Sequence, residues 1–294
     1  MARNGWGTFV PPEGYKQGEA VRIEPLNDTI GASVTDIAPD DLTNAEVAGA
    51  LLDALERFGV LAFKGLHISD EQHVAFSRHF GEVEILPVPG LEYPEIFTVS
   101  LDPDKALSAE YLKGTFHWHI DGATDDIPNK ATMLNALDVS STGGETQFCN
   151  TYAAWEALPA SEKARYQGLR VLHSFAAAQR RVYPDPSEDQ VEFWEKRPAK
   201  VQPLAWTHRS GRTSLVLGAT ASHVIDMDPD ESTELIARLE AWTTDERFRY
   251  QHSWDTGDLV LWDNRGTMHR ALPYAPDSGR LMHRTTIVGD EPFA

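Results

Sequence analysis

His119 and Asp121 stand two residues apart in the segment TFHWHID, whose composition is typical of a β-strand. Side chains two apart on a strand project from the same face, so both groups are placed to bind one metal ion, and His117 shares that face. The pair alone is weak evidence, because a chain with 11 histidines and this many aspartates is expected to contain about one His-x-Asp pair by chance. A surface histidine beside an acid is the competing interpretation.

A third candidate ligand lies far along the chain, in the segment GDLVLWDNRGTMHRAL. This segment predicts a strand, a polar turn and then His269, which comes 150 residues after His119. Two imidazoles and one carboxylate form the facial triad of non-haem iron enzymes, which leaves coordination positions open for O2 chemistry.

Two arginines follow in the segment GRLMHRTTIVGD. In strand geometry Arg280, Met282 and Arg284 face the same way, so both guanidinium groups are expected to point toward the metal. A dicarboxylate ligand would suit this pair, because arginine binds carboxylates with a planar fork of donors. Surface arginines flanking a strand are the alternative interpretation.

Four motifs in this order resemble the TauD/TfdA family: WHID at 118–121, GGET at 143–146, WDNRGTMHR at 262–270 and RLMHRTTIVGD at 280–290. The resemblance covers roughly residues 21–290. It implies a mainly β fold with flanking helices (α+β), built on a double-stranded β-helix (jelly-roll) core. It also implies an Fe(II)-dependent dioxygenase that couples the decarboxylation of 2-oxoglutarate, with O2, to the oxidation of a second substrate, releasing succinate and CO2.

Residue by residue, the resemblance implies that His119, Asp121 and His269 bind iron. It further implies that Thr146 and Arg280 hold the distal carboxylate of 2-oxoglutarate. Halogenating relatives replace the metal-binding carboxylate with a small residue, so the presence of Asp121 favours oxygenation.

The second substrate is expected to be a small organic molecule that carries a carboxylate or an aromatic ring. The segments GETQFCNTYAAWEALP, LGATASHV and FRYQHSWDTGDLVLWDNR resemble the 2,4-dichlorophenoxyacetate branch more than the taurine branch. Leu86 and Thr115 stand where sulfonate-binding members carry His and Asn, which disfavours taurine. Hydroxylation next to an ether oxygen would lead to ether cleavage, so the enzyme is expected to act as a hydroxylase or as an oxidative dealkylase.

Other polar side chains are candidates for substrate contact. His117 is expected on the pocket wall. Arg284 is expected to hold a substrate carboxylate or the other end of 2-oxoglutarate, and His223, Arg180 and Arg181 are expected in covering loops. A structural or solvated role is an equally simple interpretation of each of them.

Two further functions compete with this interpretation. A metal-dependent hydrolase would use the same three ligands to hold zinc and activate water, and would leave Thr146 and Arg280 without a role. A non-catalytic jelly-roll binding protein would have kept the pocket and lost the reaction.

The surrounding sequence predicts the elements that position these residues. A capping box at Thr43 and Glu46 begins a helix that runs to Phe58, the run at 60–64 is a buried strand, and Ser69 with Gln72 begins a second helix that runs to Phe80. Further helices are expected near 152–167, 187–196 and 229–243. The expected strands are TFHWHID, ATMLNAL, ETQFC, TSLVLG, DLVLWD and LMHRTTIVG.

Composition and charge narrow the class of protein. We expect one domain over residues 21–294 and an extended arm over residues 1–20 that acts between the subunits of a homo-oligomer. The net charge of -19 disfavours nucleic acid and anionic membranes as partners. Cys149 is the single cysteine, and no apolar run is long enough to span a bilayer, so a cytoplasmic protein acting on small molecules is expected.

Overall fold

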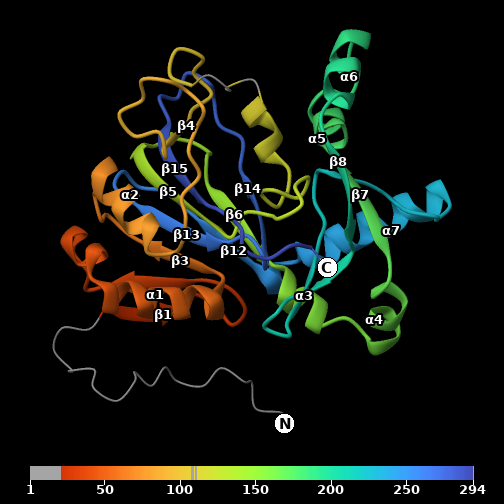
Figure 1. Ribbon diagram of the computed structural model, residues 1–294, viewed down its shortest axis with the longest axis horizontal. Coiled ribbons are helices and arrows are strands. Elements are labelled where there is room, and N and C mark those ends of the chain that lie inside the picture. Colours follow the sequence, from red (N-terminus) through yellow and green to blue (C-terminus); the bar gives the residue numbers. More distant parts are fainter. Residues whose placement is uncertain (1–20, 107–108, 110, 294) are drawn as a thin grey trace.

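A seven-stranded sheet forms the centre of the computed structural model, which describes residues 21–106, 109 and 111–293 (Figure 1). Its neighbouring strands are antiparallel except for one parallel pair, β2 with β3. In spatial order the strands are β1 (Arg22–Pro25), β2 (Ala32–Thr35), β3 (Val60–Phe63), β13 (Leu259–Asp263), β5 (Ala131–Asp138), β15 (Leu281–Ile287) and β4 (Phe97–Val99).

Strand β13 shows why this sheet is buried on both faces. All five of its residues are buried. Leu259 and Leu261 pack into one apolar cluster, whereas Val260 and Trp262 pack into another. Alternate side chains of a strand point to opposite faces, so each face must be covered by a separate layer.

Two helices, α1 (Ala45–Phe58) and α2 (Asp70–Arg78), cover the first face (Figure 1). Ser69 and Gln72 form the expected capping box of α2, although the helix ends at Arg78, before Phe80. The expected start of α1 is wrong. Asn44 caps that helix by accepting hydrogen bonds from two backbone N–H groups, and Thr43 ends a preceding 3-10 helix, η1 (Pro39–Thr43).

A second, three-stranded antiparallel sheet packs on the other face. Its strands are β12 (Arg249–His252), β6 (Thr146–Asn150) and β14 (Thr267–Ala271), with β6 in the middle. Phe148 of β6 contributes to the same buried cluster as Val260 and Trp262. His269 is the cross-strand partner of Phe148, so it also faces the space between the two sheets.

The remaining elements pack beside this two-sheet body (Figure 1). Two small antiparallel sheets consist of β11 (Ala221–Val224), β7 (Arg170–Ser174) and β8 (Ala199–Pro203), and of β10 (Thr213–Leu215) and β9 (Ala205–Thr207). The helices are α3 (Thr151–Glu156), α4 (Ala160–Tyr166), α5 (Phe175–Val182), α6 (Glu188–Glu195) and α7 (Pro229–Thr243), with 3-10 helices η2 (Tyr111–Phe116) and η3 (Glu246–Phe248).

Two sequence expectations differ from these elements. The expected helix at 152–167 is two helices, with Pro159 capping the second. The segment TFHWHID is not a strand: η2 occupies its beginning, and only His119 forms a β-bridge, to His269. A strand needs a partner along its length, and here the pairing is limited to one residue.

No helix within the described residues is long and apolar enough to cross a membrane. The arm expected at residues 1–20 lies outside the part of the chain that the structure describes.

Candidate active site

The side chains of His119, Asp121 and His269 converge between the two sheets. The atoms that they offer to a metal lie within 4.8 Å of one another. His119 Nε2 lies 3.8 Å from Asp121 Oδ1, and His269 Nε2 lies 3.8 Å from Asp121 Oδ2. The structure therefore brings together the three ligands that the sequence predicts.

Backbone pairing sets the spacing of the two imidazoles. The N–H of each histidine donates to the carbonyl of the other, at 3.0 and 2.9 Å. Residues paired in this way project their side chains to the same side, and the two ring centroids are 4.1 Å apart. A single β-bridge thus positions His119, which the sequence analysis had placed on a full strand.

Hydrogen bonds behind the ligands orient them. His119 Nδ1 lies 2.8 Å from the carbonyl oxygen of His117 and must donate to it, which leaves Nε2 with the lone pair that a metal requires. The Thr132 hydroxyl donates to Asp121 Oδ2 at 3.1 Å and itself accepts from Asn264 Nδ2 at 2.8 Å. His119 and Asp121 are therefore each held in one orientation by these hydrogen bonds.

Electrostatics keep two of the ligands in their metal-binding forms. Burial raises the pKa of the Asp121 carboxyl, but charge interactions with His269, Arg284 and His119 and the hydrogen bond from Thr132 together outweigh burial and lower this pKa to about 2. Burial lowers the pKa of His269 to about 3, and nearby His119 acts in the same direction. At neutral pH the site offers a carboxylate and an unprotonated imidazole.

This donor set fits a metal ion. Two imidazole nitrogens and a carboxylate face one another at short range, and lone pairs in this arrangement repel unless a cation lies between them. His269 Nδ1 is buried and has no hydrogen-bond partner among the described residues, so the bonding capacity of this ring lies at Nε2, toward the other ligands. Two histidines and one carboxylate suit Fe(II) and leave coordination positions open.

Arg280 is a buried cation at the edge of the same space. Its side chain is 3% exposed, and its donors reach only the Tyr274 hydroxyl and the Gly144 carbonyl, both at 3.4 Å. Among the described residues it forms no ion pair with a carboxylate. A buried guanidinium with such weak bonding is costly, so the position favours an anionic ligand.

The GGET motif makes room for this arginine. Gly144 has a φ of +83°, and a Cβ atom there would lie 3.1 Å from Arg280 Nε. Two residues later, Thr146 begins β6 and is 4% exposed. The motif therefore places a small residue against Arg280 and, two residues later, a buried hydroxyl at the start of β6.

Arg284 lies on the inner face of β15, next to the triad. Its cross-strand neighbours are Leu134 of β5 and Phe97 of β4. The guanidinium lies over the Phe97 ring, 4.7 Å from its centroid, and Nε is buried without a hydrogen-bond partner among the residues described. Arg284 also contributes to the low pKa of Asp121, so it lies within electrostatic reach of the metal site.

Comparison with known proteins agrees with this geometry. The family described as "Taurine catabolism dioxygenase TauD, TfdA family" matches residues 22–286. The chain belongs to the TauD/TfdA family. It is 33% identical, over 92% of its length and 99% of the relative, to the alpha-ketoglutarate-dependent 2,4-dichlorophenoxyacetate dioxygenase of Cupriavidus pinatubonensis. It is 32% identical, over 92% of its length and 96% of the relative, to the (S)-phenoxypropionate/alpha-ketoglutarate-dioxygenase of Sphingobium herbicidovorans.

A solved structure of a related protein supports the assignment of the chain to this family. AAD-2 in complex with Mn(II) and N-oxalylglycine superimposes with a TM-score of 0.79 and 28% identity, covering 94% of this chain and 100% of that one. As a member of the TauD/TfdA family, the protein is a non-haem dioxygenase that uses Fe(II), 2-oxoglutarate and O2. The hydrolase and the non-catalytic binding protein have no support from these relatives.

The other candidate substrate residues differ in burial and in the partners that they already bind. His117 is half-buried beside His119, and burial together with nearby Arg181 lowers the pKa of its imidazole. Arg181 is bound to Glu240 through two short hydrogen bonds of one guanidinium nitrogen, both at 3.0 Å. Arg180 pairs with Glu195 at the surface.

His223 lies on the exposed side of β11, where its ring contacts the hydroxyl of Ser222. Within the described part of the chain, no hydrogen bond or ion pair joins His223 to the triad. The structure therefore shows no direct interaction that connects His223 to the metal-binding residues.

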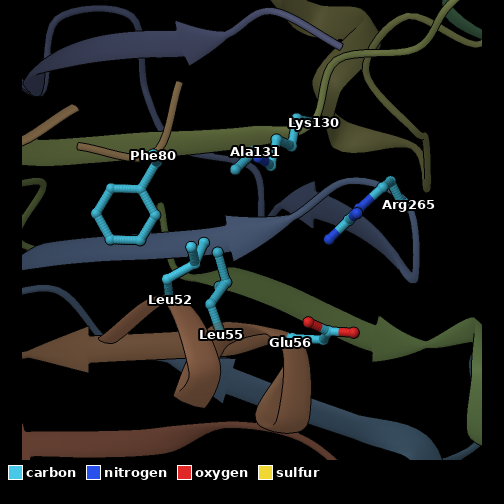
Figure 2. Close-up of a pocket in the computed structure, with 7 residues that line it drawn as sticks. All are labelled: Leu52, Leu55, Glu56, Phe80, Lys130, Ala131 and Arg265. Atoms are coloured by element: carbon cyan, nitrogen blue, oxygen red, sulfur yellow. The ribbon is translucent and has the colours of Figure 1, made fainter. Parts of the chain in front are cut away.

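Figure 2 shows a cavity of the structure whose lining includes none of the three triad residues. It has a volume of about 120 Å³. Leu55, Phe80 and Ala131 from its wall belong to the cluster beneath the helices, on the face of the sheet opposite the triad. This cavity is therefore not the substrate pocket.

Residues that support the site were missed in the sequence. Thr132 lies in the expected strand ATMLNAL, and Asn264 and Trp262 lie in the motif WDNRGTMHR, of which only His269 was assigned a role. Polar residues inside otherwise buried segments are the signal that would have identified them.

Proposed function

We propose that His119, Asp121 and His269 bind the Fe(II), and that Thr146 and Arg280 bind the distal carboxylate of 2-oxoglutarate. The convergence of the three ligand atoms within 4.8 Å supports the first assignment. The buried Arg280, which has no acidic partner in the described residues, supports the second. A Thr hydroxyl and an Arg fork together supply the donors that a carboxylate requires.

We further propose that Arg284 binds a carboxylate of the oxidised substrate, which also carries an aromatic ring. The observation that carries this proposal is the guanidinium of Arg284, whose central carbon lies 4.7 Å from the centroid of the Phe97 ring beside the triad, and whose buried Nε has no partner among the described residues. A guanidinium binds a carboxylate through its planar fork of donors. The two relatives are named for 2,4-dichlorophenoxyacetate and (S)-phenoxypropionate, and both compounds belong to this substrate class.

In this mechanism O2 is the oxidant: bound Fe(II) and 2-oxoglutarate would activate it, so that one oxygen atom enters succinate with release of CO2 and the other converts a substrate C–H bond to C–OH. The protein binds and orients. Arg284 anchors the carboxylate of the substrate, so that the adjacent C–H bond lies toward the triad, and the apolar inner faces of the two sheets exclude water. In an aryl ether, the hydroxylated carbon would be a hemiacetal and would release a phenol, so hydroxylation and dealkylation share these residues.

The test compares two ligands that differ only in the carboxylate. Fe(II) and 2-oxoglutarate are added without O2, and the visible charge-transfer band of the complex is followed during titration with phenoxyacetate or with phenoxyethanol. We expect phenoxyacetate to perturb the band and phenoxyethanol to be without effect. In Arg284→Leu the two compounds should behave alike. Equal responses in the unsubstituted protein would contradict the proposed role of Arg284.

Three broader features belong to the same proposal. The packing of the three-stranded sheet on the seven-stranded sheet supports a double-stranded β-helix core within one domain at residues 21–294. The net charge of -19 supports small molecules, and not nucleic acid or membranes, as partners. A cytoplasmic location is consistent with the single cysteine. We also propose a homo-oligomer, and analytical ultracentrifugation would test the oligomeric state.

A further inference from the structure

The hydroxyl of Thr146 already has one hydrogen bond. The indole N–H of Trp254 donates to Thr146 Oγ1 at 3.0 Å. No described residue accepts a hydrogen bond from this hydroxyl, although Thr146 is 4% exposed. A hydroxyl has one hydrogen to donate, so the bond from Trp254 orients the oxygen while its hydrogen stays available for a ligand.

The ring of Trp254 is fixed from behind by His252. The two rings meet edge to face, with centroids 4.5 Å apart and planes at 75°. His252 is itself held at both nitrogens: Nδ1 lies 2.9 Å from the Tyr250 hydroxyl and Nε2 lies 3.0 Å from Asp258 Oδ2. An imidazole with both nitrogens bonded cannot rotate without losing two hydrogen bonds, so it is a rigid support for the indole.

Asp258 anchors this support to the seven-stranded sheet. Its carboxylate is fully buried and accepts from the ammonium group of Lys64 at 2.6 Å and from the backbone N–H of Gly65 at 2.9 Å. It also accepts from the backbone N–H of Asp255 at 2.9 Å, which is the residue after Trp254. The turn that carries Trp254 is thereby tied to the end of β3 across the sheet.

We propose that Trp254 is a positioning residue that aims the Thr146 hydroxyl at the distal carboxylate of 2-oxoglutarate. This inference rests on the proposed role of Thr146 in binding the co-substrate. Trp254 acts through Thr146: it occupies the lone pair of the oxygen and directs the O–H bond toward the space beside Arg280. The turn at residues 253–257 and the network behind it are then part of the co-substrate site.

The test is the substitution Trp254→Phe, which removes the N–H donor and keeps an aromatic ring at a half-buried position. Binding is measured by calorimetry under anaerobic conditions with Fe(II) present. We expect the Kd of 2-oxoglutarate to rise about two- to tenfold, which corresponds to one neutral hydrogen bond. The Kd of 2-oxobutanoate, which lacks the distal carboxylate, should not change, and neither should the affinity for Fe(II).

Trp242→Phe is the matched control. Trp242 on α7 also donates an indole hydrogen bond, at 2.9 Å to the carbonyl of Ala154. Its loss should leave the binding of both 2-oxo acids unchanged. If Trp254→Phe weakens both acids equally, or neither, Trp254 does not position Thr146 and the inference is overturned.

Two further variants separate this inference from the proposal on which it rests. If Thr146→Val leaves the Kd of 2-oxoglutarate unchanged, the proposed role of Thr146 fails and the role of Trp254 fails with it. If Thr146→Val weakens binding while Trp254→Phe does not, only the role of Trp254 fails. Should Trp254→Phe not fold, Trp254→His keeps a ring N–H and should bind 2-oxoglutarate more tightly than Trp254→Leu. Equal affinity of these two variants would contradict the inference.

Discussion

Arg280 is a buried charge that has no acidic partner among the described residues. Its guanidinium is almost fully enclosed and, among the described residues, forms only two long hydrogen bonds, both to neutral groups. Burying a charge with such weak bonding is costly, and a bound carboxylate would offset this cost. This supports the proposal that Arg280 binds the co-substrate.

Replacing this charge should affect the co-substrate and spare the metal. We expect Arg280→Ala to raise the Kd of 2-oxoglutarate about 10- to 100-fold, because hydrogen bonds to charged groups contribute about 1.5–3 kcal/mol. Fe(II) affinity should stay within about twofold, since Arg280 has no contact with the triad among the described residues. Anaerobic calorimetry measures both constants, with Arg180→Ala as a surface control. A loss of Fe(II) binding would show that Arg280 has been assigned to the wrong partner.

Thr132 carries the second prediction at the level of single residues. Its hydroxyl donates to Asp121 and accepts from Asn264, so Thr132→Val removes one hydrogen bond from the Asp121 carboxylate and one from the buried Asn264 Nδ2. Losses behind a metal ligand typically reduce metal affinity about 10- to 100-fold. Titration with Fe(II) should show a decrease in this range. Thr243→Val, which removes a buried hydroxyl bond on α7, is the control and should bind Fe(II) normally.

At the scale of the elements, the start of α1 separates two interpretations of the same sequence. Thr43 and Glu46 have the spacing of a capping box, but the helix begins one residue later, at Asn44. The Asn44 side chain accepts from the N–H groups of Glu46 and Val47, whereas the Thr43 hydroxyl donates to the Asp40 carbonyl. Asparagine and threonine are both good caps, so the local sequence did not decide between them.

Urea denaturation of two variants tests this assignment. Asn44→Ala should lower the free energy of unfolding by about 1 kcal/mol, because it removes the observed cap. Thr43→Ala should lower it by less, since only one exposed hydrogen bond is lost. The opposite order would mean that the capping box read from the sequence operates after all.

The segment TFHWHID shows what sequence reasoning could and could not reach at this scale. Its residue types and spacing made His119 and Asp121 candidate metal ligands, and the distant His269 together with the family resemblance supported them. Its conformation was predicted wrongly, because pairing with β14 is limited to one residue and depends on a strand 150 positions away. Candidate ligands can be recognised from residue types and motifs, whereas strand pairing depends on the distant partner.

At the scale of the whole molecule, the active site depends on contacts between distant segments. Arg284 and Phe97 are brought together by the pairing of β15 with β4, and Thr146 and Trp254 by the pairing of β6 with β12 and the turn that follows it. The motifs supplied the side chains that we propose for binding iron and 2-oxoglutarate. They gave no sign of Phe97 or Trp254, because a residue that supports another one carries no chemical signature of its own.

Three buried histidines away from the metal site link the stability of the whole fold to pH. Burial lowers the pKa of His73 to about 3, of His173 to about 4 and of His208 to about 3. An unfolded histidine has a pKa of about 6.5, so each of these residues gains a proton on unfolding at mildly acidic pH. Their contribution to stability is fully present above about pH 6.5 and is lost as the pH falls toward the folded values.

We therefore expect the free energy of unfolding to decrease between about pH 6.5 and 4, with each histidine adding up to about 1.4 kcal/mol per pH unit to the slope. Urea denaturation at several pH values measures this slope. His173→Gln should reduce it by the share of one proton, whereas His223→Gln, at an exposed position, should leave it unchanged. If His173→Gln and the unsubstituted protein show the same slope, His173 is not a neutral buried group in the folded protein.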